Sequence, residues 1–180
     1  MKNILIRRPK STDVQALHQF FFLVIQDTFA KEGLSELVED QQNEWAMKKH
    51  YLAMDLASQG QQRFFWVAVE PKTEEIIGTI EYGEANVLIQ QTIQEDLANC
   101  PEIGTVYVHP NYQQRGIGTM LLQHMLTTLE TQQIPSFCLD SGYRQAQIVW
   151  QKKLGKPDFC LEHYWGPNTH HMIWKRSIPF

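Results

Sequence analysis

The sequence predicts an α/β (α+β) fold in which a mixed sheet carries helices on both faces. Apolar residues switch between strand spacing and helical spacing along the chain, and the resulting order is β-α-α-β-β-β-α-β-α-β-β. No internal repeat, low-complexity tract or linker interrupts that order. The 180 residues therefore suit a single domain over 1–180 with a sizeable core.

The first half of the chain predicts a strand, two helices and a hairpin. Asn3 to Arg8 alternates as a strand, and Thr12 with Gln15 forms the capping-box pattern of a helix start. A polar, acidic stretch over 31–44 leads into a second helix that ends near Ala57. Two runs of aromatic and branched residues around the turn PKTEE form the hairpin, Arg63 to Glu70 and Ile76 to Gly83.

The second half begins with an insertion over 84–101, whose form the sequence leaves uncertain and partly helical. A third sheet strand over 102–110 ends at a proline, and the helix over 116–131 places its leucines on one side. A strand over 134–140, a helix over 144–154 and a terminal strand pair around the turn GPNT complete the order.

Composition excludes several classes of partner. The net charge of -4 gives no general attraction to nucleic acid or to anionic membranes. No apolar run approaches the length that spans a bilayer or forms a signal peptide, so a cytoplasmic location is expected. Cys100, Cys138 and Cys160 are isolated, and we expect buried thiols rather than disulfides or a metal site.

Two glycines, Gly116 and Gly118, stand where the helix over 116–131 begins. The first N–H groups of a helix have no partner within it and carry the positive end of its dipole, which suits phosphate. A dinucleotide fingerprint would need a third glycine where Leu121 stands, and a P-loop would need a Gly-Lys-Ser/Thr ending that the chain lacks. A plain left-handed turn beside a surface arginine, Arg115, is the alternative.

The run QQRGIG over 113–118 follows VHP over 108–110 and precedes an amphipathic helix. It resembles the coenzyme A signature of the GNAT superfamily of N-acetyltransferases, and QKKLGK in the next helix and the order of elements extend the resemblance along nearly the whole chain. The resemblance implies a mostly antiparallel sheet of six or seven strands flanked by about four helices. It implies transfer of an acetyl group from acetyl-CoA to a primary amine in a ternary complex, without a metal. A homodimer is possible in this family.

The same resemblance assigns the cofactor to two stretches. Backbone groups of Val106, Tyr107 and Val108 would pair with the pantetheine arm, and one of their N–H groups would polarise the thioester carbonyl. The pyrophosphate would lie on the loop and the helix start. The cofactor-binding residues expected there are Gln113, Gln114, Arg115, Gly116, Ile117, Gly118 and Thr119.

Glu102 is the expected general base. It precedes Gln113 by eleven residues, the interval that separates the catalytic glutamate from the corresponding glutamine in the histone-acetylating branch of the superfamily. A solvated glutamate at the start of a strand is the alternative, and Glu81 on the neighbouring strand is a second candidate base.

The general acid departs from the family pattern. Many members carry a tyrosine before KLG that protonates the departing thiolate, but alignment places Gln151 or Trp150 there, and neither is an acid. Tyr143, which opens the same helix, is the remaining candidate, and water is the other source of the proton. Two rival functions stay open: a non-catalytic acyl-CoA-binding or regulatory module on the same fold, and a nucleotide-dependent phosphotransferase, which the missing P-loop lysine disfavours.

Overall fold

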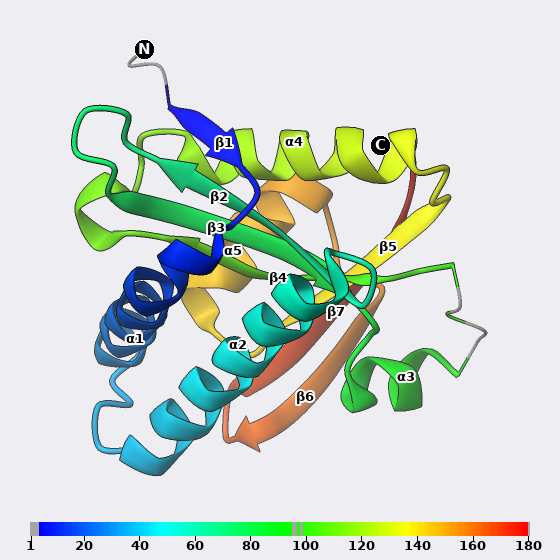
Figure 1. Cartoon of the computed structure of the whole chain (residues 1–180). Helices are drawn as coiled ribbons and strands as arrows, with labels where there is room; N and C mark the ends of the chain where they lie inside the picture. The colour runs from blue at the N-terminus through cyan, green and yellow to red at the C-terminus, as the bar shows by residue number, and fades with distance from the viewer. Residues whose placement is uncertain (1–3, 95–96, 98, 180) are drawn as a thin grey trace. The chain divides into compact units, whose positions relative to one another are not determined.

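A computed structural model describes residues 4–94, 97 and 99–179 (Figure 1). Within that part of the chain, seven strands form one mixed, mostly antiparallel sheet in the order β1-β2-β3-β4-β5-β7-β6. The helices and strands are β1 Leu5–Arg7, α1 Val14–Lys31, α2 Val38–Ser58, β2 Arg63–Val69, β3 Ile76–Gly83, α3 Val87–Ile93, β4 Glu102–Val108, α4 Ile117–Thr131, β5 Ser136–Ser141, α5 Arg144–Leu154, β6 Phe159–Gly166 and β7 Thr169–Ser177. The predicted α/β fold is confirmed.

The chain forms two compact units. Unit 1 comprises residues 1–82 and 105–125, and unit 2 comprises residues 83–104 and 126–180. The boundaries fall inside β3, β4 and α4, so each of these elements contributes residues to both units. That residues 1–180 act as a single domain stays a prediction.

Unit 1 packs helices on both sides of its strands. In Figure 1, α1 and α2 lie on one side of β1, β2 and β3, and the first half of α4 lies on the other. On the first side, Phe21 of α1 packs against Phe65 and Tyr107, with ring centroids 6.2 Å apart in both pairs. On the other side, a Cβ added to Gly78 of β3 would lie 2.9 Å from Leu121 Cδ1, so glycine allows α4 to approach the sheet closely. Both faces of the unit 1 sheet are therefore covered.

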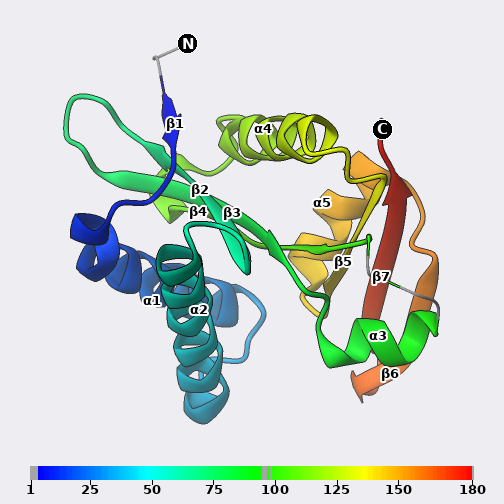
Figure 2. The ribbon, with the colours of Figure 1, turned by 45° about the vertical axis from the view of Figure 1, so that its right-hand side comes forward.

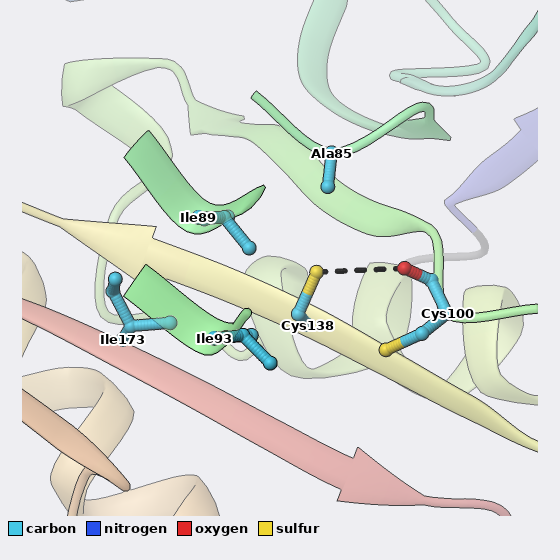
Figure 3. Packing of buried hydrophobic residues seen from close by; sticks show 6 residues of the cluster. All are labelled: Ala85, Ile89, Ile93, Cys100, Cys138 and Ile173. Atoms are coloured by element: carbon cyan, nitrogen blue, oxygen red, sulfur yellow. Dashed lines mark hydrogen bonds between the residues drawn. The ribbon is translucent and has the colours of Figure 1, made fainter. Parts of the chain in front are cut away.

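Unit 2 has its own apolar core beneath the short helix α3. Ile89 and Ile93 of α3 point toward Cys138 of β5 and Ile173 of β7 (Figure 3). A hydrogen bond with Cys100 and burial raise the pKa of the Cys138 thiol, which makes it an unreactive core residue. β6 and β7 run side by side in Figure 2 and pair antiparallel. No helix formed by the described residues combines the length and the apolar character that crossing a bilayer requires.

The insertion over 84–101, expected to be partly helical, holds α3 as a fifth helix, because its apolar face is buried on the unit 2 sheet. Two details of the sequence analysis need correction. Thr12 does not cap α1: a 3-10 turn precedes the helix, and the carboxylate of Asp13 accepts the N–H of Lys10 at 2.7 Å. Cys160 is exposed rather than buried. Asn3, the expected start of the first strand, lies outside the described residues.

Candidate active site

Strand β4 loses its regular geometry at Thr105. This buried threonine has a φ of 48°, a left-handed conformation that costs a β-branched residue about 1–3 kcal/mol. Thr79 Oγ1 donates a hydrogen bond of 2.9 Å to the carbonyl oxygen of Thr105, and Thr105 Oγ1 donates one of 3.1 Å to Glu81. Buried and half-buried residues alternate up to Thr105, whereas the next three residues, 106–108, are all half-buried. The strained residue Thr105 therefore stands immediately before residues 106–108, the segment that the resemblance assigned to the pantetheine arm.

Gln113 connects this segment to the glycine loop. Its Nε2 donates to the carbonyl oxygen of Val108 at 3.2 Å, and its Oε1 accepts a hydrogen bond of 2.8 Å from Lys31 Nζ. The Gln113 side chain thus positions the loop between β4 and the end of α1, while the backbone remains able to contact a ligand.

The loop itself has the geometry of an anion site. Gln114 and Gly116 have φ values of 60° and 82°, and the residues over 114–116 are exposed. The helical ladder of α4 begins with the N–H groups of Thr119 and Met120, which each donate 3.0 Å bonds to Gly116 O. The N–H groups of Ile117 and Gly118 precede that ladder and have no acceptor within the helix. Successive backbone N–H groups in this conformation form a nest for a phosphate.

The two glycines serve different purposes. Gly116 adopts a left-handed conformation that strains any other residue, although no protein atom would meet its added Cβ within 4 Å. Gly118 is not left-handed, and an added Cβ would meet only Val108 Cγ2, at 3.6 Å. Because protein packing alone would tolerate a side chain at Gly118, a ligand that approaches the backbone is the better reason for glycine there. The exposed guanidinium of Arg115, 5.2 Å from the Tyr112 ring, adds positive charge to the same loop.

The two candidate bases lie in different surroundings. Glu81 is completely buried, and its Oε2 lies 2.9 Å from Arg63 Nη1 while its Oε1 accepts from Thr105. Glu102 is half-buried, and its Oε2 accepts the backbone N–H of Asn86 at 2.8 Å. Both oxygens of Glu81 are therefore engaged within unit 1, whereas Glu102 belongs to a hydrogen-bonded group in unit 2.

Tyr143 occupies the N-cap position of α5 and is half-buried. Its backbone N–H donates to Ser141 Oγ at 3.2 Å. At the position where the family often has a tyrosine, Trp150 is buried and Gln151 is exposed. Tyr143, at the start of α5, therefore stays the candidate for the general acid.

Three polar residues near Glu102 were missed from sequence. Asn86 donates its side-chain N–H to Asp140 Oδ2 at 2.9 Å, and His171 Nε2 lies 3.0 Å from the same oxygen. A carboxylate at the end of a predicted strand was a signal that could have pointed to Asp140. Nothing local marks Asn86, which lies in the insertion. Among the described residues, no three His, Cys, Asp or Glu side chains are grouped to hold a metal.

Comparisons with known proteins agree with this geometry. The sequence profile of the "Acetyltransferase (GNAT) family" matches residues 30–155. A search of curated proteins finds no match.

Several solved structures share the fold. The PaiA N-acetyltransferase of Thermoplasma acidophilum, in complex with coenzyme A, is 18% identical over 97% of this chain and 99% of its own, with a TM-score of 0.68. A ribosomal-protein-alanine N-acetyltransferase of Brucella melitensis is 19% identical over 97% and 99%, with a TM-score of 0.67. A chimeric spermidine N-acetyltransferase from Vibrio cholerae is 12% identical over 97% and 95%, with a TM-score of 0.64. With the profile spanning more than half of its residues, the chain belongs to the GNAT family of acetyltransferases.

Proposed function

We propose that this acetyl-CoA-dependent N-acetyltransferase acetylates a primary amine by direct attack within a ternary complex. The observation that carries the proposal is the exposed glycine loop at the start of α4, whose N–H groups precede the helical ladder. The amine nitrogen attacks the thioester carbonyl carbon, and the C–S bond breaks after the C–N bond forms. A base takes one proton from the amine, and the coenzyme A thiolate takes one from an acid or from water.

Each cofactor contact follows from a local feature. The N–H groups over 114–118, with Thr119 and the Arg115 guanidinium, would hold the pyrophosphate. Val106, Tyr107 and Val108 follow the strained Thr105, and their backbone would pair with the pantetheine arm. A backbone N–H that stabilises the oxyanion would lower the barrier by about 3–4 kcal/mol.

Glu102 is the base that the surroundings favour. A base must reach the amine, and Glu102 is half-buried, whereas Glu81 is completely buried and bound to Arg63 and Thr105. Glu81 is better suited to holding Thr105 in its strained conformation. Tyr143 would supply the proton to the thiolate.

The test replaces Glu102 by glutamine, which keeps the shape and removes the proton acceptor. We expect kcat to fall about a hundredfold or more, with unchanged affinity for acetyl-CoA. The matched control is Glu130→Gln, an exposed glutamate of α4, which should keep wild-type turnover. Turnover measured against pH decides the role: the limb that rises with pH should weaken in the Glu102 variant, and equal profiles would reject Glu102 as base.

The names of two structural neighbours indicate amine acceptors of different size. One is described as acting on spermidine and another on the alanine of a ribosomal protein. This range supports an amine acceptor for the present chain and leaves its size open. A cytoplasmic location and a homodimer stay predictions.

A non-catalytic acyl-CoA-binding module is the second candidate function. The observation in its favour is the pair of residues at the tyrosine position, a buried Trp150 and an exposed Gln151. Thiol release from acetyl-CoA over a panel of amines separates the two, because a binding module would release none. A thermal shift with coenzyme A shows whether the cofactor site is present in either case.

A further inference from the structure

A row of polar residues, joined by hydrogen bonds and by one ion-pair contact, crosses one face of the unit 2 strands. It comprises Glu102 of β4, Asn86, Asp140 of β5, His171 of β7 and Trp165 of β6, and all five lie in unit 2. Asn86 connects the two carboxylates, because its backbone N–H binds Glu102 at 2.8 Å and its side-chain N–H binds Asp140 at 2.9 Å. In this row a single residue, Asn86, separates the carboxylate of Asp140 from that of the proposed base, Glu102.

Within the described part of the chain, no lysine or arginine side chain pairs with Asp140. Its side chain is 16% exposed, and its one ion pair within the described part of the chain is with His171. The buried Nε2 atom of His171 lies 3.0 Å from Asp140 Oδ2 but makes no aligned hydrogen bond with any described residue. A largely buried carboxylate without a cation is costly unless a partner completes it.

Trp165 binds the second ring nitrogen of His171. The indole Nε1 can only donate, and it donates to His171 Nδ1 at 3.0 Å. His171 Nδ1 is therefore already engaged by the indole, and Nε2 is the ring nitrogen that faces Asp140.

Two exposed aromatic side chains, Trp165 and Tyr164, contact the His171 ring. Trp165 is 61% exposed and Tyr164 is 47% exposed, and their rings meet edge to face with centroids 4.8 Å apart. Both rings lie within 6 Å of the His171 ring, at 5.8 and 5.7 Å. These rings contact the histidine that itself lies 3.0 Å from Asp140. A carboxylate attracts an organic ammonium through charge, and an aromatic face does so through cation–π interaction. The His163 and His170 rings of this hairpin have centroids 5.4 Å apart. Its other titratable or charged side chains are Cys160, Glu162, Lys175 and Arg176.

We propose that Asp140, Trp165 and Tyr164 form a subsite for an ammonium group of the acceptor other than the one that is acetylated. The preferred acceptor then carries two ammonium groups, as in an aliphatic diamine or a peptide with a free N-terminus next to a lysine. Glu102 receives the proton of the reacting amine, and Asp140 holds the second cation. The link to acetylation rests on the proposed function, whereas the subsite itself is tested by binding.

The test measures binding by calorimetry to the full chain saturated with coenzyme A. One pair of probes is 1,4-diaminobutane and 1-aminopentane, in which a methyl group replaces the second ammonium. The other pair is alanyl-lysine amide and alanyl-norleucine amide, which distinguishes a peptide source from a small diamine. We expect the wild-type chain to bind the doubly charged member of at least one pair about tenfold more tightly, which is about 1.4 kcal/mol.

Asp140→Asn should abolish that preference and leave the singly charged probe bound as before. Glu162→Gln, which removes one exposed negative charge from the same unit, should keep it. Gly142→Ala provides a second variant that keeps the Asp140 side chain. An added Cβ would lie 2.5 Å from Trp165 Nε1 and 3.2 Å from His171 Nδ1, so it would displace the indole from the histidine. This variant should also weaken the preference.

The outcomes separate the two proposals. Equal binding of both members in both pairs, or a preference that survives Asp140→Asn, would overturn the subsite. A preference that depends on Asp140 without any acetylation of the probes would support the subsite and count against the proposed function. Where acetylation occurs, the subsite predicts that Asp140→Asn raises KM for the doubly charged acceptor more than it lowers kcat.

Discussion

Replacing Glu81 by glutamine tests whether this residue supports the fold or acts in the reaction. Its carboxylate lies 2.9 Å from Arg63 Nη1, and the two side chains are 1% and 5% exposed. Glutamine would place a neutral amide against a buried guanidinium, and removing one partner of a buried ion pair costs about 3–5 kcal/mol. For a chain of this length, each kcal/mol shifts Tm by about 2–4 °C, so we expect Tm to fall by about 6–20 °C.

The assay is thermal unfolding of Glu81→Gln beside Glu102→Gln. Glu102 is half-buried, and its hydrogen bond from the Asn86 N–H can be kept by the amide oxygen of glutamine, so its variant should lose about 1 kcal/mol or less. Replacing both Arg63 and Glu81 by apolar residues should recover part of the stability, because neither charge is then left unpaired. A Glu81→Gln protein with wild-type Tm and lost turnover would refute the reasoning and make Glu81 the base.

Two further predictions concern the cofactor loop and the first helix. Gly118→Val should stay folded and weaken coenzyme A binding about tenfold or more, measured by calorimetry; unchanged binding would remove the loop from the site. For Asp13, burial alone would raise the pKa, but hydrogen bonds from Arg7 and from the Lys10 N–H lower it below its ordinary value of 3.8. Because the unfolded chain binds that proton more readily, the contribution is present above the ordinary pKa and is lost as pH falls through the folded pKa. Asp13→Asn should cost about 1 kcal/mol or less in urea unfolding at pH 7 and progressively less as pH falls through the folded pKa, and a difference that stays constant with pH would contradict the assignment.

Elements with strong periodicity could be predicted from sequence, and so could the cofactor loop. The spacing of apolar residues predicted α1, α4 and α5, and the aromatic and branched runs predicted β2 and β3. The loop was predictable because its glycines and helix start are adjacent in the chain. The geometry adds that Gly116 is left-handed whereas Gly118 has room for a side chain, and the sequence could not distinguish these two roles.

The surroundings of the candidate catalytic residues could not be predicted, because they depend on distant residues. Glu81 and Arg63 are eighteen positions apart, and only the pairing of their strands makes the buried ion pair. The sequence predicts an ordinary strand residue at Thr105. Its left-handed backbone is held by hydrogen bonds with the side chains of Thr79 and Glu81, which lie far away in the sequence. Sequence spacing therefore favoured Glu102 and kept Glu81 as a second candidate, and the burial of Glu81 now adds a structural reason for the same order.

The insertion explains why stability and acceptor preference should change together in unit 2. A helix of seven residues such as α3 is not stable alone, so it depends on burial of Ile89 and Ile93 and on its N-cap. That cap is Asn86, whose side-chain oxygen accepts from the N–H of Ile89 at 3.0 Å while its two N–H groups bind Glu102 and Asp140. Losing the Asn86 side-chain amide would loosen the helix start and release Asp140, whereas the backbone N–H at this position would still bind Glu102. A change of acceptor is therefore easier to reach by changing Asp140 or Trp165 at the far end of the row than by changing the residue at its centre.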